Sequence, residues 1–212
     1  MRIDFVSDIT CPWCAIGLAA LLAALDRLGR SVQAEIHPQP FELNPGMPPQ
    51  GEDIPHYMGR KYGLAAEAIA ERRAVIVGRG AAVGFAFGAR THVWNTFDAH
   101  RLLHWAGPQG RALQLKQALL AAYHARGENV SSPEVLLRLA GETGLDVERA
   151  RDVLEGGEYA DAVRERMRHW RRRGIDSVPA FVIDERHLIQ GGQPVEVFEQ
   201  ALREIAPQYA SG

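Results

Sequence analysis

A pair of cysteines three residues apart, Cys11-Pro12-Trp13-Cys14, most constrains what this chain can fold into. The motif follows an apolar run, residues 3–6, and precedes an alanine- and leucine-rich stretch, residues 16–28. This order predicts a strand, a short turn and a helix, with Pro12 at the first helical position, where its missing N–H costs nothing. Cys11 then lies at the helix N-terminus, where unpaired amides and the helix dipole stabilise a thiolate.

Cys14 lies almost one helical turn further on, within reach of Cys11 but deeper. This geometry predicts a redox dithiol, in which an exposed Cys11 attacks a disulfide and Cys14 resolves the mixed disulfide. Half of a zinc site is an alternative, but the sequence has no second cysteine pair and no histidine pair flanked like a zinc finger. A chance pair of buried thiols is another alternative, which the strand, proline and helix around the motif disfavour.

Composition narrows the function classes. The chain has 212 residues, 46% of them hydrophobic, which is enough for a core without disulfide staples. A net charge of −2 points to neither nucleic acid nor an anionic membrane surface. Two cysteines in one motif and an N-terminus that runs directly into a strand predict a cytoplasmic protein. We expect no membrane span, because the apolar run at residues 19–25 is far shorter than the ~20 residues required.

The rest of the pattern predicts a strand–helix–strand unit, a helical region and a hairpin followed by a helix. Alternating apolar residues at 32, 34 and 36 predict a second strand, parallel to the first. Prolines and glycines dominate residues 39–53, and residues 55–157 are nearly all helical in pattern. The elements predicted after them are a helix at 158–173 with a basic end, a hairpin at 177–190 and a last helix at 194–205.

This order, with a dithiol at the start of the first helix, is similar to the thioredoxin fold, and the long insertion resembles the DsbA-like members of that fold. A closer resemblance, to the FrnE-type branch, rests on five segments: Ser7-Asp8, Phe41-Glu42-Leu43-Asn44-Pro45, Asn95-Thr96 with Ala99-His100, residues 174–181, and Gly191-Gly192-Gln193-Pro194. The resemblance covers essentially the whole chain. It implies an α/β fold class, a thioredoxin fold (βαβ plus ββα, mixed sheet) with a large all-helical insertion. The thioredoxin-like domain would comprise residues 1–43 and 158–212, and the insertion residues 44–157.

The resemblance also implies that Val178-Pro179 is a cis peptide bond that faces the dithiol. A proline there removes an N–H near the sulfur and leaves the Val178 backbone free to pair with an extended substrate. An edge-strand proline without a role is the alternative. Together with Pro12 and an exposed Trp13, this bond is the predicted substrate-binding surface.

Polar residues near the motif are candidate modulators, namely Asp8, Asn95 and His100. Asp8 either carries protons to and from the thiols or serves as a local cap at the strand exit. His100 and His104 share a helical face, but no third ligand accompanies them, so we predict no metal site.

Three functions remain open. The first is a thiol–disulfide oxidoreductase that acts on protein or small disulfide substrates, with no tightly bound cofactor and glutathione as a candidate co-substrate. The second, implied by related 2-hydroxychromene-2-carboxylate isomerases and kappa-class glutathione transferases, is glutathione activation by Cys11. The third is a redox-sensing binding module. The presence of Cys14 favours the oxidoreductase, because disulfide exchange needs a resolving thiol and glutathione activation does not. We leave a homodimer open.

Overall fold

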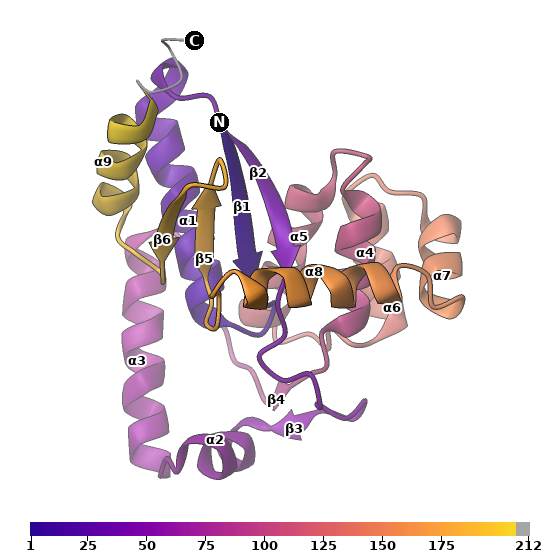
Figure 1. Ribbon diagram of the computed structural model, residues 1–212. Helices are drawn as coiled ribbons and strands as arrows, with labels where there is room; N and C mark the ends of the chain where they lie inside the picture. Colours follow the sequence, from indigo (N-terminus) through magenta and orange to yellow (C-terminus); the bar gives the residue numbers. More distant parts are fainter. Residues whose placement is uncertain (207–212) are drawn as a thin grey trace.

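A four-stranded mixed sheet forms the centre of the protein in the computed structural model, which describes residues 1–206 (Figure 1). The strand order is β2-β1-β5-β6. Strand β1 (Arg2–Ser7) pairs in parallel with β2 (Glu35–Pro40) and antiparallel with β5 (Ala180–Ile183). Strand β6 (His187–Gln190) completes the predicted hairpin. The expected thioredoxin fold is therefore confirmed. Residues 207–212 of the predicted second segment lie outside the described residues.

The second strand starts later than predicted. Alternation at residues 32–36 indicated a strand there, but Gly29–Ser31 form a 3-10 turn and β2 begins at Glu35. It then continues through Pro38 and Pro40, which pair with Phe5 and Ser7 of β1. Prolines are tolerated in this strand because it lies at the edge of the sheet.

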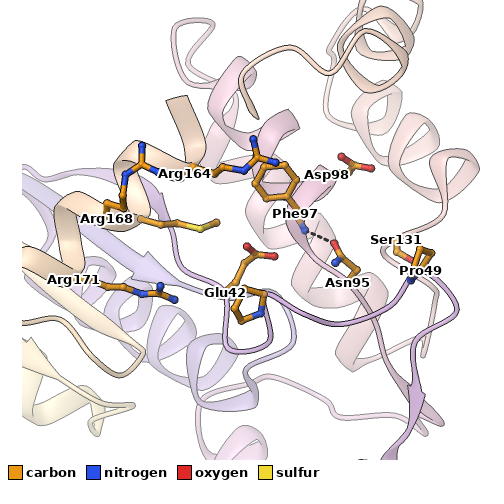
Figure 2. Close-up of a pocket in the computed structure, with 11 residues that line it drawn as sticks. Glu42, Pro49, Asn95, Phe97, Asp98, Ser131, Arg164, Arg168 and Arg171 are labelled. Carbon is orange, nitrogen blue, oxygen red and sulfur yellow. Dashed lines mark hydrogen bonds between the residues drawn. The ribbon is translucent and has the colours of Figure 1, made fainter. Parts of the chain in front are cut away.

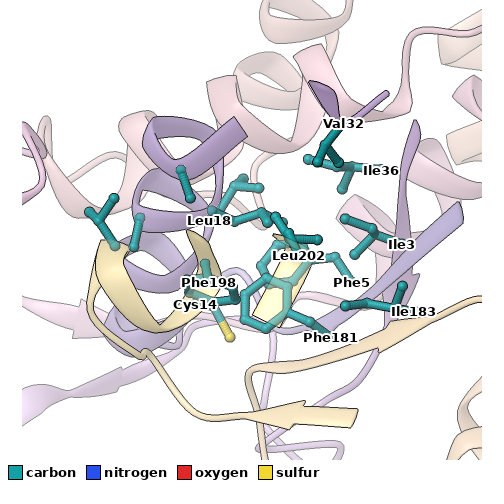
Figure 3. Close-up of a cluster of buried hydrophobic side chains, with 14 of the residues drawn as sticks. Ile3, Phe5, Cys14, Leu18, Val32, Ile36, Phe181, Ile183, Phe198 and Leu202 are labelled. Atoms are coloured by element: carbon teal, nitrogen blue, oxygen red, sulfur yellow. The ribbon is translucent and has the colours of Figure 1, made fainter. Parts of the chain in front are cut away.

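Helices cover both faces of the sheet. Helix α1 (Pro12–Leu28) and helix α9 (Val195–Ile205) lie on one face, and α8 (Ala160–Arg172) crosses the other (Figure 1). Side chains that alternate along β1 and β5 fill the first interface, where Phe181 stacks on Phe5 and meets Phe198 edge-on (Figure 3). Trp170 anchors the second interface. Cys14 lies in the first of these two cores.

The region between β2 and β5 is mostly helical. Its helices are α2 (Ile54–Tyr62), α3 (Ala66–Ala82), α4 (Phe97–Ala106), α5 (Ala112–His124), α6 (Pro133–Glu142) and α7 (Val147–Glu155). The expectation of an all-helical insertion needs one correction, because β3 (Glu52–Asp53) and β4 (His92–Val93) form a short antiparallel pair. Helix α5 packs on the sheet side of this region, and its Leu120 belongs to the same core as Cys14.

One helix passes a length and composition test for a membrane span, contrary to the expectation from short apolar runs. Residues 12–31 have a mean hydropathy of 1.3. Half of that window is buried inside the fold, where α1 packs against the sheet and α9. The core helix of a globular domain meets the same criteria, so this feature is explained by packing.

Candidate functional site

The dithiol lies at the start of α1, as predicted. Cys11 is the residue before the first helical turn and has extended backbone angles, φ −82° and ψ 113°, while Pro12 occupies the first turn. The backbone N–H of Cys14 donates to the Cys11 carbonyl at 3.1 Å. Cys11 therefore lies at the N-terminal end of α1, whereas Cys14 is carried one turn inward to the core.

Cys11 is much less exposed than predicted, with 4% of its surface accessible, and Cys14 has none. The Cys11 thiol faces Val178 and lies 3.7 Å from its carbonyl oxygen, to which the S–H donates. The Val178-Pro179 bond is cis, which confirms the geometry implied by the family resemblance. Val178 is half-buried and Pro179 is buried, so this segment covers the sulfur that the sequence placed at the surface.

Trp13 is also not the exposed side chain that the sequence suggested. It is half-buried, and so is Pro12. The loop after β6 comes so close that a Cβ at Gly192 would lie 3.0 Å from the Trp13 carbonyl oxygen and 3.2 Å from its ring. On the other side, the Arg79 guanidinium of α3 lies 5.9 Å from the Trp13 ring centroid and donates to the Gly192 carbonyl. Elements distant in sequence therefore enclose Trp13.

Asp8 is fully buried directly before the dithiol. Its carboxylate accepts hydrogen bonds from the backbone N–H groups of Ile9, at 2.7 Å, and Leu43, at 2.8 Å. His100 Nε2 lies 3.5 Å from Asp8 and 3.1 Å from the Phe41 carbonyl. Burial opposes ionisation of Asp8, yet these donors leave its pKa lowered, while burial lowers the pKa of His100. The contact with His100 and the hydrogen bond from Leu43 thus favour the ionised form of Asp8 despite its burial.

Asn95, the third candidate modulator, lies apart from this group. Its side chain accepts from the Phe97 N–H at 2.9 Å and donates to the Met47 carbonyl at 2.9 Å. It therefore joins the start of α4 to the loop after β2 and does not contact the dithiol. Figure 2 shows it on the wall of a cavity whose lining residues include neither cysteine.

Lys116 of α5 is a fully buried lysine that the sequence analysis missed. Its Nζ lies 3.5 Å from the Ser7 carbonyl and 5.8 Å from the Phe5 ring centroid. Burial lowers the pKa of Lys116 to about 8, although negative charge on Cys14, Asp8 and Cys11 acts in the opposite direction. Burial, followed by the Cys11 sulfur, raises the pKa of the Cys14 thiol, and the Lys116 charge counteracts that rise.

His124, on the same helix, is the second buried residue that was missed. Its Nε2 lies 2.9 Å from the Ile9 carbonyl, and burial lowers the pKa of His124 well below its ordinary value. The sequence contains one signal that predicts burial of both Lys116 and His124. Lys116, Leu120 and Tyr123 follow the spacing of a single buried helix face, and His124 lies on the same face.

Among residues 1–206 no group of three histidine, cysteine or acidic side chains is placed to hold an ion. His104 is instead half-buried beside Tyr159, with ring centroids 5.4 Å apart.

The fold and this helix-borne dithiol define a thioredoxin-type domain. The chain belongs to the DsbA-like thioredoxin domain family, whose sequence model matches residues 2–203. It is similar to the crystal structure of a probable DsbA oxidoreductase from Streptomyces coelicolor, with 35% identity, a TM-score of 0.90 and coverage of 100% of this chain and 91% of that chain. Membership of this family supports an enzyme with a redox or isomerase role.

Two further solved structures share the fold at low identity. The cytosolic disulfide reductase DsbM from Pseudomonas aeruginosa, solved with GSH, is 18% identical with a TM-score of 0.64, covering 99% of each chain. A 2-hydroxychromene-2-carboxylate isomerase is 14% identical with a TM-score of 0.73, covering 99% of this chain and 98% of that one. A 2-hydroxychromene-2-carboxylate isomerase, one of the relatives that the predicted resemblance implies, is therefore among the structural neighbours.

Proposed function

We propose that this protein is a thiol–disulfide oxidoreductase that cycles Cys11 and Cys14 between a dithiol and a disulfide. The observation that carries the proposal is the placement of the two sulfurs. Cys11 lies at a helix N-terminus against the Val178 carbonyl, and Cys14 lies buried one turn behind it. Cys11 can therefore react with a substrate disulfide, whereas Cys14 can react only with Cys11.

The exchange proceeds in two balanced steps. The Cys11 thiolate attacks one sulfur of a substrate disulfide, so that a mixed disulfide forms and the other substrate sulfur leaves as a thiolate. The Cys14 thiolate then attacks Cys11, which forms the Cys11–Cys14 disulfide and releases the second substrate thiolate. Two electrons pass from the dithiol to the substrate. Two molecules of glutathione, which become glutathione disulfide, or one molecule of a dithiol then reduce the Cys11–Cys14 disulfide.

Lys116 supports the second step. Cys14 must lose its proton in a buried site, where burial raises its pKa. The Lys116 ammonium is the buried cation whose charge favours the Cys14 thiolate. Asp8 acts on the same site, since its backbone lowers the pKa of the Cys14 thiol. We assign Lys116 and Asp8 as positioning residues for Cys14.

The substrate side consists of Pro12, Trp13, Val178 and Pro179. Because Cys11 is 4% exposed, a substrate disulfide reaches it only at this narrow opening or after a small displacement of its cover. We propose disulfide-bearing proteins or small disulfides as substrates, glutathione as co-substrate and the cytoplasm as location. The DsbM structure with GSH supports the glutathione part of this proposal.

The test is reduction of insulin and of bis(2-hydroxyethyl) disulfide by the prereduced protein, with glutathione supplied as the reductant where turnover is measured. Cys11→Ser is expected to lose turnover by roughly a thousandfold or more, because it removes the nucleophile. Cys14→Ser is expected to accumulate a mixed disulfide with insulin that is visible on a non-reducing gel. The two variants are matched controls for each other, since each removes one sulfur from the same turn.

Two outcomes would contradict this function. If Cys14→Ser retains full turnover of a glutathione-dependent substrate, the site activates glutathione as in an isomerase or transferase. If Cys11→Ser reduces both disulfides at the wild-type rate, the dithiol is not the reacting group.

A further inference from the structure

A cavity of about 550 Å³ lies between the loop after β2, the start of α4 and the outer face of α8 (Figure 2). Its polar lining includes Glu42 and three arginines of one helix, Arg164, Arg168 and Arg171. Its apolar walls include Pro45, Phe97 and Met167. We call it the arginine cavity. It goes beyond the proposed disulfide exchange, because neither cysteine lines it.

Glu42 is the anomaly in this cavity. Only 7% of its surface is exposed, and its Oε1 is buried without a hydrogen-bond partner among residues 1–206. Figure 2 shows its carboxylate directed into the space between the guanidinium groups of Arg164 and Arg171. Neither arginine forms an ion pair with Glu42 within 4.0 Å in the described chain. A buried polar atom without a partner is costly, so this oxygen is suited to a donor from outside.

Two of the arginines are held in place by aromatic rings. The Arg171 guanidinium lies 5.5 Å from the Phe41 centroid, and that of Arg164 lies 4.7 Å from the Phe97 centroid. Stacking on a ring orients a guanidinium while its N–H edge stays free to bind an anion. Arg168 is instead tied to Glu165 at 2.8 Å, as is Arg172, outside the cavity, at 2.6 Å. Arg164 also donates one N–H to the exposed Asp161, at the longer distance of 3.3 Å. Arg171, which has no ion pair among residues 1–206, and the remaining N–H groups of Arg164 are therefore available to a ligand.

We propose that the arginine cavity binds the zwitterionic head of an α-amino acid. The ligand carboxylate would lie against Arg164 and Arg171, and its ammonium group would donate to Glu42 Oε1. Pro45, Phe97 and Met167 favour an apolar side chain. The volume lies within the range of ordinary small-molecule sites, about 300–1,000 Å³. An anion alone would leave Glu42 without its donor, and a cation alone would face the two arginines.

The test uses L-leucine and two analogues that each lack one charged group. These are 4-methylpentanoate, without the ammonium, and 3-methylbutylamine, without the carboxylate. Isothermal titration calorimetry on the full chain is expected to show L-leucine binding at least about tenfold more tightly than either analogue, because each loses one charge-assisted contact. Glu42→Gln is expected to weaken L-leucine by a similar factor and to leave 4-methylpentanoate as tight or tighter.

Arg171→Gln and Arg172→Gln form a matched pair on neighbouring positions of α8. Arg171→Gln is expected to weaken both L-leucine and 4-methylpentanoate by about tenfold. Arg172→Gln removes the same charge outside the cavity and is expected to change neither. If both substitutions weaken L-leucine equally, the effect is general positive potential and the proposal fails.

A second readout follows the proton on Glu42. Burial raises the pKa of Glu42 to about 7; Asp8 and Asp98 also raise it, whereas Arg171 and Arg164 lower it. An ammonium group favours the ionised carboxylate, so binding should release about nine-tenths of a proton at pH 6 and about one-tenth at pH 8. Titrations in buffers of different ionisation enthalpy measure that release. Equal binding of 4-methylpentanoate and L-leucine, or no heat from millimolar L-leucine, would overturn the proposal.

Discussion

Adjacent residues 42 and 43 serve two different sites. The Leu43 backbone N–H donates to Asp8 beside the dithiol, whereas the Glu42 side chain enters the arginine cavity. In the dithiol site, neighbouring residues stabilise the buried charges. Asp8 accepts several hydrogen bonds, and Lys116 lies near Asp8 and the two cysteines. The arginine cavity leaves Glu42 Oε1 without a partner among the described residues. The difference indicates that the charged groups of the first site are balanced among the described residues, although His124 Nδ1 is also without a partner there, and that the second site accommodates a ligand.

The largest effect on stability is expected at Lys116. Lys116→Met keeps a similar volume but removes the buried charge, whose pKa is lowered from the ordinary 10.5 to about 8. Below pH 8 the buried lysine is charged in the folded protein, and the full destabilisation is present. The destabilisation disappears as the pH rises to the ordinary lysine pKa of 10.5. We expect the free energy of unfolding to rise by about 3 kcal/mol at pH 7 and by almost nothing near pH 11. Urea denaturation across this pH range measures the difference.

Gln117→Met is the matched control for that substitution, since Gln117 is exposed on the same helix. It should change stability by less than about 0.5 kcal/mol at every pH. Lys116→Met should also slow the Cys14 attack that resolves a mixed disulfide, by roughly tenfold, because the thiolate loses its nearby cation. A variant that is no more stable at pH 7 and resolves at the wild-type rate would remove Lys116 from the account of the dithiol.

A smaller loss is expected at Asp8. Asp8→Asn replaces one acceptor oxygen by an amide that faces donors from Leu43, Ile9 or Thr10. We expect the free energy of unfolding at pH 7 to fall by about 2 kcal/mol. Because the pKa of Asp8 is lowered from 3.8, its contribution is present above that value and lost as pH falls further. Denaturation at pH 7 and near pH 3 tests this, and an equal loss at both would contradict it.

The smallest effect is expected at Glu42. Because the pKa of Glu42 is raised, the folded protein keeps this proton to a higher pH than the unfolded chain does. The destabilisation caused by the buried carboxylate therefore develops as the pH rises from 4.5 to about 7. Glu42→Gln should leave stability unchanged at pH 4. Above pH 7 it should raise the free energy of unfolding by about 1 kcal/mol, a value reduced for screening in an open cavity. If the gain is as large at pH 4 as at pH 8, Glu42 titrates normally and the contrast between the two sites disappears.

Local patterns predicted the elements around the dithiol. Pro12 after Cys11 marks a helix start, and Val195, Phe198, Leu202 and Ile205 share the buried face of α9. These features depend on neighbours in the chain, so the sequence contains them. The left-handed backbone of Asp184 and Glu185 also forms the hairpin turn without the preferred Asn-Gly pair.

Long-range packing was the limit of the sequence analysis. A lysine is exposed by default, so Lys116 was passed over even though it occupies an apolar face of α5. Trp13 and Cys11 were expected at the surface but are covered in the structure. The residues that cover them, Arg79, Val178 and Gly192, lie far away in the chain. The boundary between the two domains at residue 44 stays a prediction.

The order in which the chain is made has a consequence for the dithiol. Cys11 and Cys14 leave the ribosome before Lys116 and Val178, which follow more than a hundred residues later. Because domains acquire their structure as units during synthesis, a nascent chain carries both thiols before the Val178 segment covers Cys11 and before the fold buries Cys14. Protection of the growing chain from oxidation thus falls to the cell before it can fall to the fold.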